Sequence, residues 1–216
     1  MTCALLFCAV SLEAKVHIIS FSPWQKVKLV TGENEDRSWE MWVRTLSVDG
    51  RAREFTVGEM HEITDRVFVV RRAYRVNDAL PSERGKQMWR WQRGGWLIVD
   101  RFTGGIKPLT LADFDPFYST ATWFRDYVAY CGVSEAGDHV YAMVVQVGRR
   151  KPLVKKPLGA ALVGEAPDSE CDAPEWQRHP LRVTFAPHAK EKVAFAVRPR
   201  MAENPADEVA EEGGEE

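Results

Sequence analysis

The chain has 216 residues, 45% of them hydrophobic, and a formal net charge of −2. This length and hydrophobic content suffice for one all-β domain or two small ones, and exclude a chain that is disordered throughout. The charge is uneven, because residues 201–216 hold seven acidic side chains and no basic one. The preceding part is therefore only mildly basic, well below what is typical of nucleic-acid-binding proteins, so we expect no nucleic-acid partner.

The first 14 residues include an apolar run, Ala4–Val10, that is followed by small side chains. Such a run is typical of a secretory signal peptide, although no lysine or arginine precedes it. It is too short to span a bilayer. We therefore interpret residues 1–14 as the remnant of a signal peptide and predict a periplasmic or secreted protein without an integral membrane span. An ordinary buried N-terminal strand is the alternative.

Residues 15–198 consist of short apolar runs separated by turn residues, which predicts a single all-β domain of antiparallel hairpins. An Asp-Gly pair at positions 49 and 50 separates two such runs, a strong hairpin signal. A second tight turn is predicted at Arg93–Gly95. Further hairpins fall between Trp96 and Leu158, and the other predicted strands are Lys15–Phe21, Val27–Val30, Trp39–Val48, Ala52–Val57, Asp65–Val76, Met88–Gln92, Leu181–Phe185 and Lys192–Val197.

Two segments have the composition of irregular structure. Residues 160–173 are rich in glycine, alanine and acids and show no regular period, which predicts a long loop. Residues 199–216 contain few large apolar side chains and many acids, which predicts a disordered acidic tail.

Two motifs resemble parts of β-propeller blades. The sequence V-D-R-F-T-G-G at Val99–Gly105 resembles the Asp-x-x-Thr-Gly turn that closes many WD-type blades. The sequence A-T-W-F-R-D-Y-V-A-Y at Ala121–Tyr130 resembles the blade-opening motif of Tol-type propellers, with Tyr127 in place of the usual glycine. The resemblance covers about residues 88–158 and implies a propeller-like fold. A β-sandwich or barrel is the alternative, because hairpins of many all-β folds look alike.

Four cysteines are present, and two of them, Cys3 and Cys8, lie in the predicted leader. Its removal leaves Cys131 in a predicted strand and Cys171 in the predicted long loop. An isolated pair of cysteines in an oxidising compartment usually forms a disulfide. We therefore predict a Cys131–Cys171 bond, with two unrelated thiols as the alternative.

Arginines and aromatic residues are interleaved in two predicted strands. Arg71, Tyr74 and Arg75 lie in one, and Trp89 and Arg93 lie in or beside the next. Arginine stacks on aromatic rings and binds carboxylates, so these residues are candidates for a face that binds an acidic partner or a glycan. The alternative is an ordinary solvent-exposed edge. A third interpretation places the shared face of Trp89 and Trp91 largely in the core, because Arg90 and Gln92, which alternate with them, are strongly polar.

Two further groups have polar or charged character. Asp113 and Asp115 are candidates for acid–base catalysis or calcium binding, or they cap turns beside a proline. Arg149 and Arg150 begin a basic run at a predicted hairpin end, which suggests either a polyanion contact or a solvated turn. Pro157 favours an edge strand nearby.

These sequence features together favour a non-enzymatic binding or scaffolding module of the cell envelope that holds a protein or glycan partner. The alternative is a hydrolase-like enzyme that pairs Asp113, Asp115 or Asp126 with His61 or His139. No histidine or cysteine has the spacing of a metal site, and no cofactor motif is present, so we expect neither metal nor cofactor. The sequence does not determine the oligomeric state.

Overall fold

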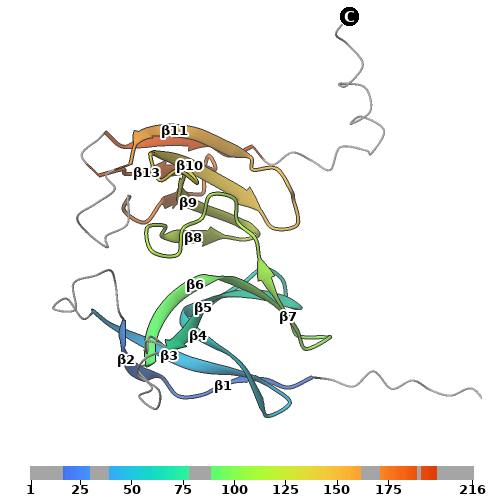
Figure 1. The fold of residues 1–216 in the computed structure, drawn as a ribbon. Coiled ribbons are helices and arrows are strands. Elements are labelled where there is room, and N and C mark those ends of the chain that lie inside the picture. Colours follow the sequence, from blue (N-terminus) through green and yellow to red (C-terminus); the bar gives the residue numbers. More distant parts are fainter. Residues whose placement is uncertain (1–16, 30–38, 78–88, 162–170, 189–190, 199–216) are drawn as a thin grey trace, which may run out of the picture. The chain divides into compact units, whose positions relative to one another are not determined.

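In the computed structural model, the chain is built from β-strands and connecting loops (Figure 1). The structure describes residues 17–29, 39–77, 89–161, 171–188 and 191–198. These parts contain no helix, and hence none that is long and apolar enough to cross a membrane. The predicted all-β, antiparallel fold is confirmed. The strands are β1 (Ile19–Phe21), β2 (Gln25–Leu29), β3 (Trp39–Val48), β4 (Arg51–Glu62), β5 (Val67–Asn77), β6 (Trp89–Asp100), β7 (Gly105–Leu109), β8 (Ala121–Phe124), β9 (Tyr127–Val133), β10 (His139–Gln146), β11 (Val154–Ala160), β12 (Glu175–Gln177), β13 (Arg182–Phe185) and β14 (Val193–Ala196).

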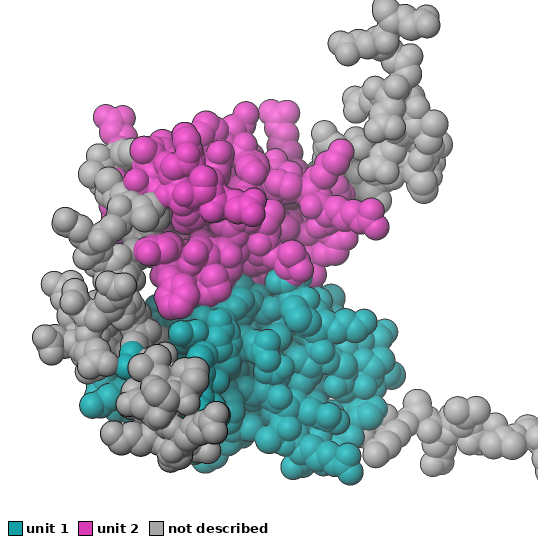
Figure 2. Space-filling model, viewed as in Figure 1, with its two compact units in different colours: residues 1–30, 35–109 teal, residues 31–34, 110–216 magenta. Residues whose placement is uncertain are grey.

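Two compact units, coloured separately in Figure 2, make up the chain. Unit 1 comprises residues 1–30 and 35–109 and holds β1 to β7, whereas unit 2 comprises residues 31–34 and 110–216 and holds β8 to β14. The range 15–198, predicted as one domain, is thus divided between two units.

Two of the predicted segments fall where the structure gives no description. The leader at residues 1–14 and the acidic tail at residues 199–216 both lie outside the described residues. Most of the predicted loop at residues 160–173 also does, although Cys171 at its end is described.

Unit 1 is a single seven-stranded sheet in the order β1-β3-β2-β6-β5-β4, with β7 paired to β6 and β3 also paired to β4. Among the described residues, all its pairings are antiparallel except that of β2 with β6, which is parallel and joins Leu29 to Trp91. Because β3 pairs with both β2 and β4, the pairings lead from β3 through β4, β5, β6 and β2 back to β3, and the sheet curls on itself.

The hairpin between β3 and β4 confirms the Asp-Gly prediction. Asp49 and Gly50 have φ angles of 51° and 73°, the left-handed conformation that a two-residue hairpin loop requires. The Asp49 carboxylate accepts hydrogen bonds from the ring of His17, at 2.9 Å, and from the amide of Ile18, at 3.1 Å. The turn thereby holds the segment that leads into β1.

The predicted turn at Arg93–Gly95 is wrong, because β6 runs unbroken through these residues. β6 pairs with β5 on both sides of Gly94 and Gly95, where the register shifts. Trp96 lies opposite Arg71 and Arg93 lies opposite Ala73, so β6 has one more residue than β5 at this point. A Cβ at Gly94 would lie 2.9 Å from Cε1 of Tyr74. Glycine is used here because the tyrosine ring of the partner strand lies against its backbone, and not because the chain turns.

Both sides of the unit 1 sheet carry buried apolar residues. Leu46, Phe68 and Leu97 belong to one cluster, whereas Met41, Val43 and Ala73 belong to another. On β5, Phe68 and Ala73 are separated by five positions, and side chains alternate along a strand, so the clusters lie on opposite sides of the sheet.

Unit 2 combines a four-stranded sheet, β11-β10-β9-β8, with a three-stranded sheet, β12-β13-β14. The two sheets share one core, since Ala129 of β9 and Val144 of β10 cluster with Val183 and Phe185 of β13. β11, which contains Pro157, is an edge strand, as the proline predicts.

Candidate functional site

Four side chains of unit 1 form a surface that we call the aromatic face: Phe55, Arg75, Trp89 and Trp91. Arg75 of β5 lies opposite Trp91 of β6, and Phe55 of β4 lies opposite Ala73. Residues two positions apart on a strand point to the same side of a sheet. Trp89 therefore joins Trp91, and Ala73 joins Arg75, so that three adjacent strands contribute to one surface.

The rings and the cation of the aromatic face are in direct contact. The Arg75 guanidinium carbon lies 4.8 Å from the ring centroid of Trp89 and 5.7 Å from that of Trp91. The Phe55 ring meets Trp91 edge-on, with a centroid distance of 5.0 Å. Within the described residues, no hydrogen bond or ion pair involves the side chain of Arg75. Its guanidinium is thus held by the rings, at about 0.5–1 kcal/mol for an exposed contact, while its N–H donors remain available.

Burial differs between the two tryptophans. Trp91 packs against the buried cluster of Met41, Val43 and Ala73, whereas Trp89 is 46% exposed. The prediction that both rings lie in the core is therefore wrong for Trp89. It pairs with Asn77 at the end of β5, beyond the apolar cluster.

The other predicted residues of this region divide between the two sides of the sheet. Arg93 is two positions from Trp91 and shares the side of the aromatic face. Tyr74 points to the other side, where the Arg72 guanidinium lies 5.9 Å from its ring. The Nε of Arg71 donates a hydrogen bond to the carbonyl of Gly94, at 3.3 Å. The structure thus brings Arg75 and Trp89 into contact, places Arg93 on the same side of the sheet, and places Tyr74 on the other side.

The predicted basic run belongs to unit 2, where Arg149 and Arg150 lie in the turn between β10 and β11. Both side chains are exposed. The backbone amide of Arg149 donates to the carbonyl of Gln146, at 3.1 Å, which closes the turn. This geometry agrees with a solvated hairpin end.

Asp113 and Asp115 lie in the loop before β8, and the carboxylate of each has a partner within unit 2. The Asp113 carboxylate lies 2.7 Å from the Lys155 ammonium, and this hydrogen bond raises the pKa of Lys155. The Asp115 carboxylate accepts from the amides of Phe117, at 2.7 Å, and Tyr118, at 3.2 Å. Asp115 thus caps a turn, as the alternative interpretation of the sequence predicts.

Within the described residues, the contacts of Asp113, Asp115, Asp126 and His139 do not join an aspartate to a histidine of the hydrolase alternative. Asp126 accepts a hydrogen bond from the Gln146 amide, at 2.8 Å. His139 lies 2.8 Å from the carboxylate of Asp138, its neighbour in the chain, and no contact of the described residues joins His139 to Asp113, Asp115 or Asp126. His61 lies on β4. The hydrolase alternative therefore stays a prediction.

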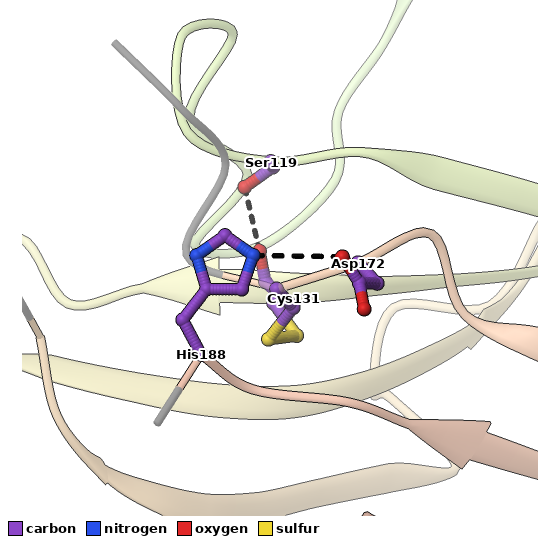
Figure 3. The surroundings of a disulfide bond; sticks show 5 residues. Ser119, Cys131, Asp172 and His188 are labelled. Atoms are coloured by element: carbon purple, nitrogen blue, oxygen red, sulfur yellow. Dashed lines mark hydrogen bonds and ion pairs between the residues drawn. A yellow bond between two sulfur atoms is a disulfide. The ribbon is translucent and has the colours of Figure 1, made fainter. Parts of the chain in front are cut away.

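Figure 3 shows the disulfide between Cys131 and Cys171, which confirms the predicted bond. Ser119, Asp172 and His188 surround it, and these residue types also form hydrolase triads. Ser119, however, is buried and donates its hydroxyl proton to the carbonyl of Cys131, at 2.6 Å. His188 contacts Asp172 at 3.5 Å. A nucleophile must lie within hydrogen-bond reach of its base, and Figure 3 draws no such bond from Ser119 to His188.

Within the parts of the chain that the structure describes, no three histidine, cysteine, aspartate or glutamate side chains are grouped so that they could hold a metal ion. The aromatic face is thus the candidate site whose side chains have the most contacts with one another. Phe55, which completes it, was not among the predicted residues.

Comparison with protein families, curated proteins and solved structures finds no match to this chain. The resemblance of residues 88–158 to Tol-type propeller blades therefore stays a prediction.

Proposed function

We propose that the protein is a non-enzymatic binding module of the cell envelope that holds a protein or glycan partner through the aromatic face. The observation that carries the proposal is the contact of the Arg75 guanidinium with two indole rings, of which Trp89 is 46% exposed. Tryptophan and arginine are the residues most often found at the centres of binding interfaces. Trp91, anchored in the core, gives the surface a rigid base.

The chemistry of the aromatic face matches a partner with both apolar and anionic groups. An exposed indole offers a flat surface for an apolar side chain or the C–H face of a sugar. Arg75 and Arg93 on the same side of the sheet add donors suited to carboxylates. Positioning the cation in advance lowers the entropy lost on binding.

The disulfide supports export as the setting of this function. Bonds such as Cys131–Cys171 form and persist in the periplasm and outside the cell, and are rare in the reducing cytosol.

Photo-crosslinking in the native host tests the proposal. A benzoylphenylalanine introduced at position 89 is expected to give a discrete adduct with an envelope protein or glycan. The same probe at position 42 is the matched control, since Trp42 is 55% exposed but alternates with Met41 and Val43 and so points away from the aromatic face. Adducts that are identical at both positions, or absent at both, would contradict the proposal.

A glycan array provides a second, quantitative test. Arg75→Ala and Trp89→Ala are each expected to weaken binding to acidic oligosaccharides by about tenfold or more, a change of about 1.4 kcal/mol, whereas Trp42→Ala leaves it unchanged. If the array shows no binding but position 89 crosslinks to a protein, the partner is a protein.

A further inference from the structure

The two sheets of unit 2 have four edge strands, and three of them have features that oppose pairing with another chain. β11 carries Lys155 and Pro157, residues that discourage pairing with another chain. β8 and β12 are linked to each other, because the Thr122 hydroxyl donates to the carbonyl of Pro174, at 2.7 Å, and the Trp176 indole donates to the carbonyl of Thr122, at 3.3 Å. β14 has the sequence Val-Ala-Phe-Ala, with neither charge nor proline.

The backbone of β14 directs part of its hydrogen-bonding groups away from the sheet. The amide of Val197 donates to the carbonyl of Leu181, at 3.0 Å. Hydrogen-bonded pairs alternate along antiparallel strands, so Phe195 also bonds to β13, whereas Ala194 and Ala196 direct their N–H and C=O groups to the open edge. Within the described residues, no hydrogen bond uses these groups. The edge of β14 is therefore open to an additional strand.

One side of β14 is cationic. Lys192 and Arg198 flank β14, two positions before Ala194 and two positions after Ala196, and this spacing puts side chains on the same side of an extended chain as the alanine methyl groups. Arg182 of β13 lies opposite Ala196 and adds a third cation. All three cationic side chains are exposed, and the small alanines leave space between them.

The other side of β14 is apolar. Val193 is 37% exposed, and the half-buried Phe195 packs against the core of unit 2. A strand added at the open edge would cover this apolar surface with every second side chain.

We infer that β14 accepts an extended acidic segment of a partner protein as an additional β-strand. Backbone bonds to Ala194 and Ala196 hold the segment, acidic side chains meet Lys192 and Arg198, and the alternate apolar side chains cover Val193. A second copy of this chain fits less well, because two fully overlapped antiparallel β14 strands bring Lys192 of one copy opposite Arg198 of the other. This interaction is independent of the aromatic face.

Fluorescence anisotropy tests the backbone pairing. The labelled peptide alternates glutamate and valine and is about eight residues long, the length of a long β-strand. Ala194→Pro removes an outward amide and no bond to β13, so binding is expected to weaken by about tenfold or more. Ala194→Val, which keeps the amide, is the matched control and retains binding. Equal binding by both variants overturns the inference.

If Ala194→Pro lowers the melting temperature, the unmodified protein is tested instead with a peptide whose valine amides are methylated. Loss of binding to that peptide supports strand pairing, and unchanged binding overturns it.

Charge is tested with a lysine–valine peptide of the same length. The unmodified protein is expected to prefer the glutamate peptide by about tenfold, and the preference should fall at high salt. The double variant Lys192→Glu, Arg198→Glu is expected to reverse it. No binding to either peptide, or equal binding to both, overturns the inference. A concentration-dependent dimer that Ala194→Pro abolishes also overturns it and assigns the edge to a second copy.

Discussion

The Cα atoms of Cys131 and Cys171 lie 6.2 Å apart although 40 positions separate them in the chain. Cys131 belongs to the fully buried strand β9, and Cys171 is itself buried in the core of unit 2. The bond thus ties the segment before β12 to the centre of the larger sheet.

Reducing this disulfide is expected to lower the stability of unit 2 by about 3–4 kcal/mol in the chain-entropy model, less any strain. Urea unfolding with and without reductant measures the change. Mass analysis of the native protein without reduction should find the two cysteine peptides joined. Two freely alkylated thiols at these positions would contradict both the bond and the export that it supports.

Gly94→Ala is expected to destabilise unit 1 by about 1–3 kcal/mol, the usual cost of overpacking. The added methyl group would lie 2.9 Å from the Tyr74 ring and 3.1 Å from Cβ of Arg72. Gly95→Ala is the matched control, because a Cβ there meets nothing within 4 Å. Urea unfolding of the two variants should separate them clearly; equal midpoints would mean that the Tyr74 ring moves aside freely.

Trp91→Ala is expected to cost about 3 kcal/mol, the lower end of the range for large aromatic truncations, because Trp91 is partly buried against Met41 and Val43. Trp42→Ala removes a more exposed indole and should change stability by less than about 0.5 kcal/mol. Chemical denaturation gives both values. A near-neutral Trp91→Ala would show that the cluster repacks without the ring.

Acid is expected to weaken the turn between β6 and β7. The Asp100 carboxylate accepts hydrogen bonds from the guanidinium of Arg66, at 3.0 Å, and from the amides of Phe102, at 2.8 Å, and Thr103, at 3.2 Å. These donors, Arg66 foremost, hold the pKa of Asp100 well below its ordinary value. A carboxyl with a lowered folded-state pKa stabilises the fold above its unfolded-state pKa, and this contribution is lost as the pH falls towards the folded-state value.

The melting temperature of the unmodified protein should therefore decline below about pH 4, the ordinary pKa of aspartate. Asp100→Asn should start lower at neutral pH and decline less. Asp65→Asn, which changes an exposed aspartate without a hydrogen bond in the described structure, should keep the pH dependence of the unmodified protein. Identical pH profiles for Asp100→Asn and the unmodified protein would contradict the role of the carboxylate.

Local sequence signals predicted those parts of the fold that depend on neighbours in the chain. The alternation of β3 and the loop at Asp49 and Gly50 follow from period and turn chemistry alone. The role of Gly94 could not be predicted, because the feature that requires glycine is the ring of Tyr74 on another strand. β12 is only three residues long and carries no period that a sequence pattern can reveal.

The aromatic face was predictable in part. Arg75 and Trp89 stood out as arginine and tryptophan in adjacent strands, and their contact follows once β5 and β6 pair. Phe55 was missed, because its place beside Trp91 depends on the register between β4 and β5. The disulfide was predictable because the predicted removal of the leader leaves only two cysteines, an argument that needs no geometry.

Among the described residues, β2 and β6 pair only through Leu29 and Trp91, and the ring of Trp91 belongs to the aromatic face. This pairing of β2 with β6, which we call the seam, is the shortest in the sheet of unit 1, so few backbone hydrogen bonds oppose its local opening. A partner that contacts the indoles of Trp89 and Trp91 is therefore expected to stabilise the β2–β6 pairing as well. Trp91 thus links partner binding to the stability of the β2–β6 pairing. A bound partner should therefore slow amide hydrogen exchange at Leu29, on the other strand of the seam, as well as at the residues of the aromatic face.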